Sequence, residues 1–260
     1  MASYNGVVVY EGPSVIDGSP IFAVLTNLGK PSKNAKTGDM SQMYIMRSDM
    51  HPVDAVQTGN DSAICGDCKH RGTMGGDTAR TCYVEVAQAP TSVFRARERG
   101  AYLPFNSQWP LSPAEAWGSV LWGYVSRKPM RLGAYGDPAA VPAEYIRPLV
   151  NACKATRVGW TGYSHTWQSK PEVFAAHRHW LMASVDNADE AVIARQQGLR
   201  YFRVTMPGES ADGEMQCAAV RENNPLHCAR CRACSGSWNP KAPSVYIEVH
   251  GNRAEHFTGR

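Results

Sequence analysis

Short apolar segments separated by polar turns run along the chain, and their spacing predicts an α/β protein. The first three segments are rich in β-branched residues, and Gly and Pro residues lie between them. They predict strands at residues 4–10, 20–26 and 42–47. The polar stretch 30–39 predicts a turn, across which the second and third strands would pair antiparallel.

From residue 131 onward, a strand, a polar tip and a helix repeat at intervals of roughly 20–25 residues. Strands are predicted at 131–135, 158–163, 180–185 and 200–205, and helices at 142–155, 171–179 and 188–197. This order is typical of parallel βαβ units. It predicts a (β/α) TIM-like barrel, complete or incomplete, with an open doubly wound sheet as the alternative.

Three more elements complete the prediction: helices at 90–100 and 113–126, and a strand at 244–249. Residues 1–210 are therefore interpreted as a barrel-like catalytic domain that includes a Cys-rich loop at 60–82. Residues 211–260 are interpreted as a metal-binding C-terminal segment.

Composition narrows the class of protein. The chain has 260 residues, 43% of them hydrophobic, which suits one sizeable domain, and its net charge of +4 permits contact with nucleic acid without requiring it. No apolar run is long enough for a membrane span, and the first ten residues lack the features of a signal peptide. We therefore expect a cytoplasmic protein, in which close cysteine pairs indicate metal or redox chemistry rather than disulfides.

The C-terminal cysteines have the pattern C-x10-C-x2-C-x2-C, formed by Cys217, Cys228, Cys231 and Cys234. Four thiolates on such short loops can turn toward one metal, so ligation is favoured over four free thiols. A tetrahedron of thiolates suits zinc, which we favour. The C-x2-C-x2-C run also resembles sequences that hold iron–sulfur clusters, so a 4Fe–4S cluster is the alternative.

A second cysteine set consists of Cys65, Cys68 and Cys82, with His70 two residues after the second cysteine. Three cysteines and His70 would complete a zinc site. Three cysteines alone would leave one coordination position open, as a catalytic iron–sulfur cluster requires. A chance pair plus a stray cysteine is the structural alternative. Cys153 falls in a predicted helix and is expected in the core.

Titratable and aromatic residues follow the predicted parallel strands, where α/β proteins bind their substrates. Asp137, His165 and Asp186 are the predicted catalytic residues, although each carboxylate could instead cap the next helix and His165 could be structural. The predicted substrate-binding residues are Tyr163, Trp167, Glu209 and Arg131.

The segments RLGAYGDPAAVP (131–142), GYSHTW (162–167) and MASVDN (182–187), with the motifs CGDCKHR and CARCRAC, resemble a family of cysteine-rich phage and prophage proteins. This resemblance covers most of the chain. That family in turn is remotely similar to phage 7-deazaguanine DNA transglycosylases, relatives of tRNA-guanine transglycosylase. The chain departs from the transglycosylases because it lacks their Asp-Ser-Gly-Gly-Phe-Gln segment and has a second cysteine cluster.

The resemblance implies an enzyme that exchanges guanine in DNA for a 7-deazaguanine base. Asp137 would be the nucleophile at the sugar C1′ or the acid–base group, and Asp186 would be its partner. Tyr163, His165 and Trp167 would line the base pocket. Two alternatives stay open: an iron–sulfur enzyme of the radical type, which the set Cys65, Cys68 and Cys82 favours, and a non-enzymatic, metal-stapled nucleic-acid-binding protein.

Overall fold

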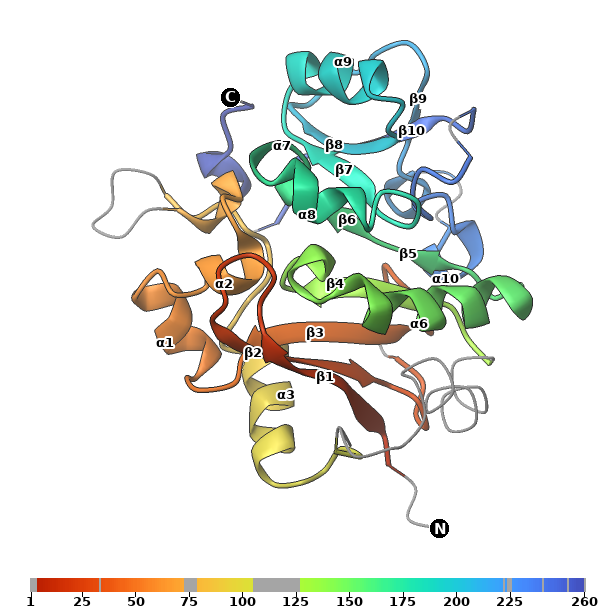
Figure 1. The fold of residues 1–260 in the computed structure, drawn as a ribbon. Helices are drawn as coiled ribbons and strands as arrows, with labels where there is room; N and C mark the ends of the chain where they lie inside the picture. Colours follow the sequence, from red (N-terminus) through yellow and green to blue (C-terminus); the bar gives the residue numbers. More distant parts are fainter. Residues whose placement is uncertain are drawn as a thin grey trace.

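The structure is a computed structural model that describes residues 4–32, 34–72, 79–104, 127–221, 223, 226–239, 241–251 and 253–259. Within these ranges the strands form two five-stranded sheets, with helices packed against them (Figure 1). The strand orders are β1-β2-β3-β4-β5 and β6-β7-β8-β10-β9. The predicted α/β class is therefore confirmed.

The first sheet begins with an antiparallel meander and continues with parallel strands. Its members are β1 (Gly6–Pro13), β2 (Pro20–Thr26), β3 (Ser41–Arg47), β4 (Met130–Tyr135) and β5 (Trp160–Thr161). The pairs β1–β2 and β2–β3 are antiparallel, the latter as the sequence predicts, whereas β3–β4 and β4–β5 are parallel.

All neighbouring strands of the second sheet are parallel. It contains β6 (Tyr163–Ser164), β7 (Met182–Val185), β8 (Tyr201–Thr205), β9 (Glu214–Gln216) and β10 (Ser244–Glu248). Only Gly162 separates β5 from β6, so one extended segment passes from the first sheet to the second. A Cβ at Gly162 would lie 2.7 Å from Leu181 Cδ2, so a side chain would clash at this crossing.

Helices connect the strands and flank the sheets. The described helices are α1 (Pro52–Gln57), α2 (Ser62–Cys65), α3 (Ala89–Glu98), α6 (Ala143–Ala155), α7 (Thr166–Ser169), α8 (Pro171–Ala175), α9 (Ala188–Gln196) and α10 (Cys228–Cys231). The predicted helix 171–179 is thus a short α8 preceded by α7, and the predicted helix 113–126 lies outside the described residues. No described helix has the length and apolarity needed to cross a membrane.

The main core lies between the sheets and their helices. On α6, Ile146, Leu149, Val150 and Cys153 are buried at helical spacing, which confirms Cys153 as a core residue. A second, smaller apolar cluster contains Met182, whereas the adjacent residues Leu181 and Ala183 belong to the main core. The two clusters lie on opposite faces of the sheet because successive side chains of a strand point to opposite faces.

The C-terminal segment is built into the second sheet. Both β9 and β10 come from residues beyond 210, and β10 pairs with β8. The sheet therefore continues across the predicted boundary at residue 210. The smaller apolar cluster, which includes Cys234 and Val245, joins this segment to β7.

Candidate metal centre at the strand ends

The Cys-rich loop lies over the carboxyl ends of parallel strands. After β3 the chain forms α1 and α2, and the carbonyl of Ile64 accepts a hydrogen bond of 2.6 Å from the N–H of Asp137, just beyond β4. The N–H of Cys82 donates to His70 O at 2.9 Å. This hydrogen bond brings Cys82 back to the segment that contains Cys65 and Cys68, although many residues separate them in sequence. The loop and the strand ends, predicted as separate features, therefore form one site.

The three thiols of this loop are near neighbours. Burial raises the pKa of Cys65 well above its ordinary value, and the charges of Cys68 and Cys82 raise it further. Burial likewise raises the pKa of Cys82, with a further contribution from Cys68. The mutual effects of the three sulfurs on these pKa values show that the cysteines lie close to one another.

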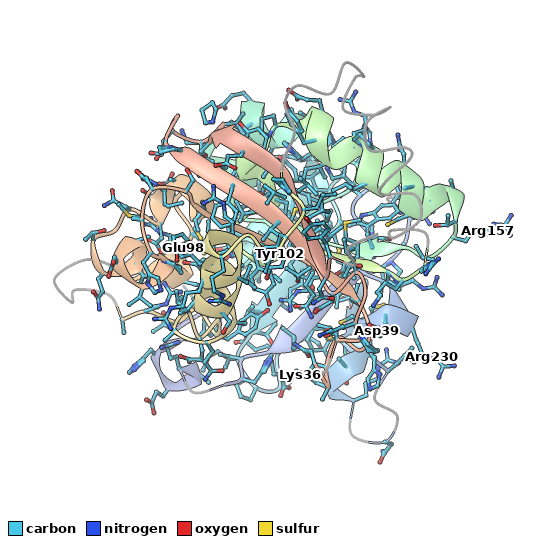
Figure 2. The ribbon with its side chains drawn as sticks, turned by 90° about the horizontal axis from the view of Figure 1, so that it is seen from below. Lys36, Asp39, Glu98, Tyr102, Arg157 and Arg230 are labelled. Atoms are coloured by element: carbon cyan, nitrogen blue, oxygen red, sulfur yellow. The ribbon has the colours of Figure 1, made fainter. Side chains whose placement is uncertain are left out.

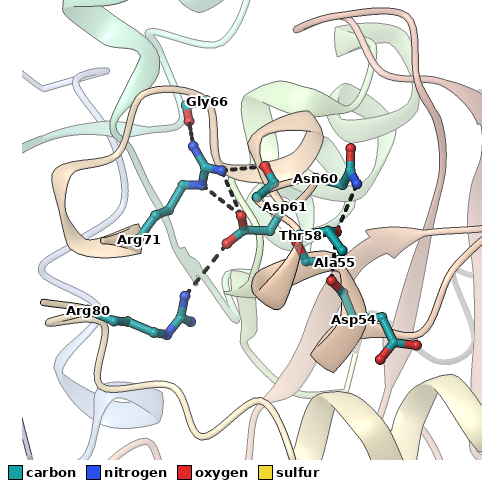
Figure 3. A network of polar contacts seen from close by, with 9 residues as sticks. Asp54, Ala55, Thr58, Asn60, Asp61, Gly66, Arg71 and Arg80 are labelled. Atoms are coloured by element: carbon teal, nitrogen blue, oxygen red, sulfur yellow. Dashed lines mark hydrogen bonds and ion pairs between the residues drawn. The ribbon is translucent and has the colours of Figure 1, made fainter. Parts of the chain in front are cut away.

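Two arginines of the same loop share one buried carboxylate, as Figure 3 shows. Arg71 donates to Asp61 Oδ1 through Nε at 3.0 Å and Nη2 at 2.7 Å, and also to the carbonyls of Gly59 and Gly66. Arg80 Nη1 lies 3.6 Å from Asp61 Oδ2. Because two partly buried cations share a single anion, a positive charge is left beside the cysteine set.

His70 fastens the loop to the end of β7. Its Nε2 lies 2.9 Å from Asp186 Oδ1 and its Nδ1 lies 2.7 Å from Thr81 Oγ1. Both ring nitrogens therefore have partners other than the cysteine sulfurs. Phe257 stacks on the ring with centroids 5.9 Å apart.

Asp186 can contact His70 because the next residue, Asn187, caps α9 in its place. Asn187 accepts the N–H of Glu190 at 2.8 Å, and Glu190 in turn accepts the N–H of Asp186 at 2.8 Å. Burial acts to raise the pKa of Asp186, but the His70 hydrogen bond and nearby positive charges outweigh it and hold the pKa below its ordinary value. Asp186 is thus an ionised carboxylate, not a helix cap.

His165 completes a set that could hold a cation. It follows β6, and its ring meets that of His70 edge to face with centroids 5.4 Å apart. Its Nε2 is buried and has no hydrogen-bond partner among the described residues. One ligand atom each from His70, His165 and Asp186 lie within 4.8 Å of one another, and no three cysteine sulfurs of the described chain form such a tight set.

Asp137 acts chiefly as a structural anchor at this site. Its Oδ1 accepts the N–H of Ala139 at 2.9 Å, and its Oδ2 accepts Ser164 Oγ at 2.9 Å and the N–H of His165 at 2.8 Å. Burial raises its pKa despite these hydrogen bonds. The capping role considered for Asp137 is therefore observed, and its carboxylate positions His165.

The predicted substrate-binding residues do not gather at the strand ends. Trp167 is buried in the core, where its Nε1 donates to Ser184 O at 2.8 Å. Glu209 lies in the exposed turn after β8. Tyr163 packs on Phe202 with ring centroids 4.7 Å apart, and Arg131 donates to the hydroxyl of Tyr83. Burial raises the pKa of Tyr163, with a further contribution from Cys234, which places Tyr163 near the C-terminal cysteines.

Two residues that sequence reasoning did not single out belong to the loop site. Tyr135 ends β4, and the charges of Cys65 and Cys82 act with burial to raise its pKa. Its hydroxyl, like Arg80 Nη1, is buried without a hydrogen-bond partner in the described structure. The position of Tyr135 at a strand end, directly before Gly136-Asp137, is the sequence feature that could have indicated its place in the site.

The C-terminal cysteines lie at the opposite edge of the sheets. All four line one cavity of about 20 Å³. The N–H of Cys228 donates to Lys36 O at 3.3 Å and the N–H of Ala229 to Thr37 O at 2.9 Å, so α10 abuts the turn that leads into β3. Figure 2 shows Lys36 and Asp39 of this turn on the same side of the molecule as Arg230. The carbonyl of Cys234 accepts the N–H of Gly162 at 3.0 Å.

Comparisons with known proteins give this chain no relative. No family model matches it, and no curated protein sequence or solved structure does so either. Its chemistry therefore has to be inferred from the residues and their geometry.

Proposed function

We propose that the protein is an iron–sulfur enzyme of the radical type, in which Cys65, Cys68 and Cys82 bind a 4Fe–4S cluster at the carboxyl ends of the parallel strands. The observation that carries this proposal is a three-cysteine set at the strand ends that no histidine nitrogen joins among the described residues of the loop, since both His70 nitrogens bond elsewhere. Three thiolates leave one iron open to a substrate or cosubstrate. The sulfurs are also less tightly grouped than a single shared ion would require.

Two buried polar atoms support a bound group at this place. Tyr135 Oη and His165 Nε2 have no hydrogen-bond partner within the described residues, and both belong to the strand ends beneath the loop. Buried polar atoms in native proteins are rarely left unpaired, so such a group implies an absent partner. The extra positive charge of Arg71 and Arg80 favours an anionic one.

A bound cluster would supply one-electron chemistry at an open iron. The chain would hold the other reactant. His165 Nε2 is the nitrogen free to bind a substrate or to move a proton, and Asp137 fixes its backbone. The pair His70–Asp186 keeps the loop closed over the strand ends.

A partial (β/α) barrel belongs to the same proposal. The supporting observation is the parallel order β3-β4-β5 in one sheet and β6-β7-β8-β10 in the other, joined through Gly162. Such an order brings the strand ends to one mouth. A cytoplasmic location, as the sequence predicts, is part of the same proposal.

The test is iron and sulfide analysis of protein purified without oxygen, followed by electron paramagnetic resonance after reduction with dithionite. Cys68→Ser should abolish the signal of the open-iron cluster, and Cys153→Ser, at a buried core cysteine, should not. S-adenosylmethionine, a cosubstrate of radical chemistry, should alter that signal in the wild type. Protein without iron, or with one metal ion that Asp186→Asn removes and Cys68→Ser retains, would overturn the proposal.

Base exchange in DNA is the second candidate, and the ionised carboxylate of Asp186 at the strand ends favours it. Asp186, rather than the fully hydrogen-bonded Asp137, would then attack the sugar C1′ of DNA and displace guanine, which leaves with a proton. An incoming 7-deazaguanine base would displace the carboxylate and release its own proton, with zinc held at the cysteines. Incubation of guanine-containing DNA with 7-deazaguanine bases, followed by nucleoside mass spectrometry, tests it. Retained DNA binding without any turnover would instead favour a nucleic-acid-binding protein.

A further inference from the structure

We infer that His70, His165 and Asp186 together bind one divalent transition-metal ion at the carboxyl ends of β6 and β7. This inference goes beyond the proposed function and does not depend on it, because none of the three ligands belongs to the cysteine set. Where both groups are bound, the ion occupies His165 Nε2 and contacts the substrate in its place.

The three ligand atoms already lie close together. One atom each from His70, His165 and Asp186 lie within 4.8 Å of one another. His70 Nε2 and Asp186 Oδ1 are 2.9 Å apart, which is close to the separation of adjacent ligand atoms that each lie about 2.0–2.2 Å from a metal. An ion can therefore replace the hydrogen bond between these two side chains with little movement, and the His165 ring has to approach them.

The sheet fixes two of the three ligands. Strands β6 and β7 are parallel neighbours, with Ser164 paired to Ala183, and neighbouring strands lie about 4.8 Å apart. His165 directly follows β6, and Asp186 directly follows β7. Their side chains therefore come together at one edge of the sheet, and the Cys-rich loop adds His70 to them.

His165 has a nitrogen that lacks a partner. Its Nε2 is buried without a hydrogen bond within the described part of the chain, which is rare for a buried polar atom. The backbone N–H of His165 donates to Asp137 Oδ2 at 2.8 Å, so the residue is held in place while its ring nitrogen is left over. A metal ion would use that nitrogen. Tyr135 Oη, near Cys65 and Cys82, stays available to the cluster.

The other two ligands have the supporting contacts of a metal site. A histidine that binds a metal through one nitrogen usually donates through the other, which fixes the ring, and His70 Nδ1 lies 2.7 Å from Thr81 Oγ1. The buried Phe257 stacks on the same ring and shields it from solvent. The N–H of Asp186 donates to Glu190 at 2.8 Å, which holds the third ligand.

The donor set indicates the class of ion. Two imidazole nitrogens and one carboxylate suit zinc, iron(II) or manganese, whereas magnesium and calcium take oxygen ligands almost exclusively. Three protein ligands also leave coordination positions open, which is the arrangement of catalytic rather than structural ions. The open positions would bind water or an oxygen or nitrogen atom of the substrate.

Manganese is the probe for this site, because Mn²⁺ prefers oxygen and nitrogen ligands and the cysteine sets select softer metals. Full-length protein is purified without oxygen, treated with a chelator to remove its resident ion, and titrated with Mn²⁺ while electron paramagnetic resonance follows the free ion. We expect one bound Mn²⁺ per chain. Pulsed paramagnetic resonance of the bound ion should show coupling to imidazole nitrogen.

His165→Phe tests the ligand set, because it keeps a planar ring, removes the nitrogen and leaves the contact between His70 and Asp186 in place. It should weaken Mn²⁺ binding by about 100-fold. The matched control is His51→Phe. His51 Nε2 is also buried without a partner among the described residues, but His51 belongs to no comparable ligand set there. This control should bind Mn²⁺ as the wild type does.

The wild-type measurement decides the inference even where a variant fails to fold. Mn²⁺ that stays free, or that binds without nitrogen coupling, would overturn it, as would equal affinity in His165→Phe and the wild type. Cluster and ion are also distinguishable. Bound Mn²⁺ that depends on His165, in protein that never holds iron, would support this inference and overturn the proposed function. Iron held through Cys68, with Mn²⁺ left free, would do the reverse.

Discussion

His70 Nε2 lies 2.9 Å from Asp186 Oδ1, a contact that joins the Cys-rich loop to the end of β7 across 116 residues of sequence. The carboxylate is buried, and the second ring nitrogen is held by Thr81. This contact joins the Cys-rich loop and the residue that follows β7, which the sequence presents as separate features, in a single site. It also gives the loop a hydrogen bond to the end of β7 that can be removed by mutation.

Asp186→Ala should therefore loosen the loop. A hydrogen bond to a charged group contributes about 1.5–3 kcal/mol, and we expect a loss of that order in the free energy of unfolding by urea, with faster proteolysis between residues 66 and 82. Glu209→Ala is the matched control, because that carboxylate is exposed in the turn after the next strand. Equal protease resistance of Asp186→Ala and Glu209→Ala would show that the contact does not hold the loop.

Asp137→Asn tests whether Asp137 is an anchor. If Asp137 were a catalytic residue, as the sequence predicts, this change should abolish turnover with little change in stability. In the structure, however, the carboxylate accepts three hydrogen bonds, from Ala139, Ser164 and His165. An amide offers only one acceptor oxygen, and its NH₂ group faces a donor. We expect destabilisation of about 1–3 kcal/mol by chemical denaturation. Asp17→Asn, at an exposed turn, is the control, and stability matching that control would return Asp137 to a purely chemical role.

The sequence predicted those elements whose pattern is local, and it missed features that depend on contacts between distant segments. The strands β2, β3, β4 and β8 and the helices α6 and α9 follow from local apolar periodicity and turn residues, and they lie within about two residues of their predicted positions. The strand 158–163 was predicted as one piece because the close approach of Leu181 to Gly162 is a tertiary contact. No local pattern records such a contact.

The sequence predicted the site residues whose position follows from the end of a strand. It did not predict which residues tertiary packing would bury. Asp137, His165 and Asp186 lie together because parallel strands end at one edge. The burial of Trp167, and the pairing of Arg71 and Arg80 with one Asp61, arise from packing between distant segments. An aromatic residue after a strand looks the same in sequence whether it lines a pocket or fills the core.

The buried ion pair between Arg203 and Glu214 should make stability depend on pH. The two side chains are joined by bonds of 2.8 and 2.6 Å that tie β8 to β9, just before Cys217. Burial acts to raise the pKa of Glu214, but the hydrogen bonds and charge of Arg203 outweigh it and hold the pKa below its ordinary value. The pair therefore stabilises the protein above the ordinary glutamate pKa, and this stabilisation is lost as pH falls through the lowered folded-state value.

Glu214→Gln should cost about 3–5 kcal/mol near neutral pH, because it leaves Arg203 buried without a counterion. The difference from wild type in urea unfolding should shrink as the pH is lowered below 4.5, the ordinary glutamate pKa. Glu11→Gln, which removes a more exposed ion pair with Arg97, should show little effect at either pH. A difference that stays constant from neutral to acidic pH would contradict the assigned direction.

Tyr135→Phe tests whether the Tyr135 hydroxyl forms a hydrogen bond to the proposed cluster or has no partner at all. The hydroxyl is buried and has no hydrogen-bond partner among the described residues, so in protein prepared without a cluster its removal should leave stability unchanged or raise it by about 1 kcal/mol. In protein reconstituted with iron and sulfide, the same change should remove a hydrogen bond to the cluster or its thiolates. Because such bonds favour the more negative, reduced form, the reduction potential of the strand-end cluster should fall. Tyr44→Phe, whose hydroxyl lies 3.5 Å from Gln42 Oε1 on β3, is the control. A potential unchanged in Tyr135→Phe, measured by redox titration with paramagnetic resonance, would show that the hydroxyl does not face the cluster.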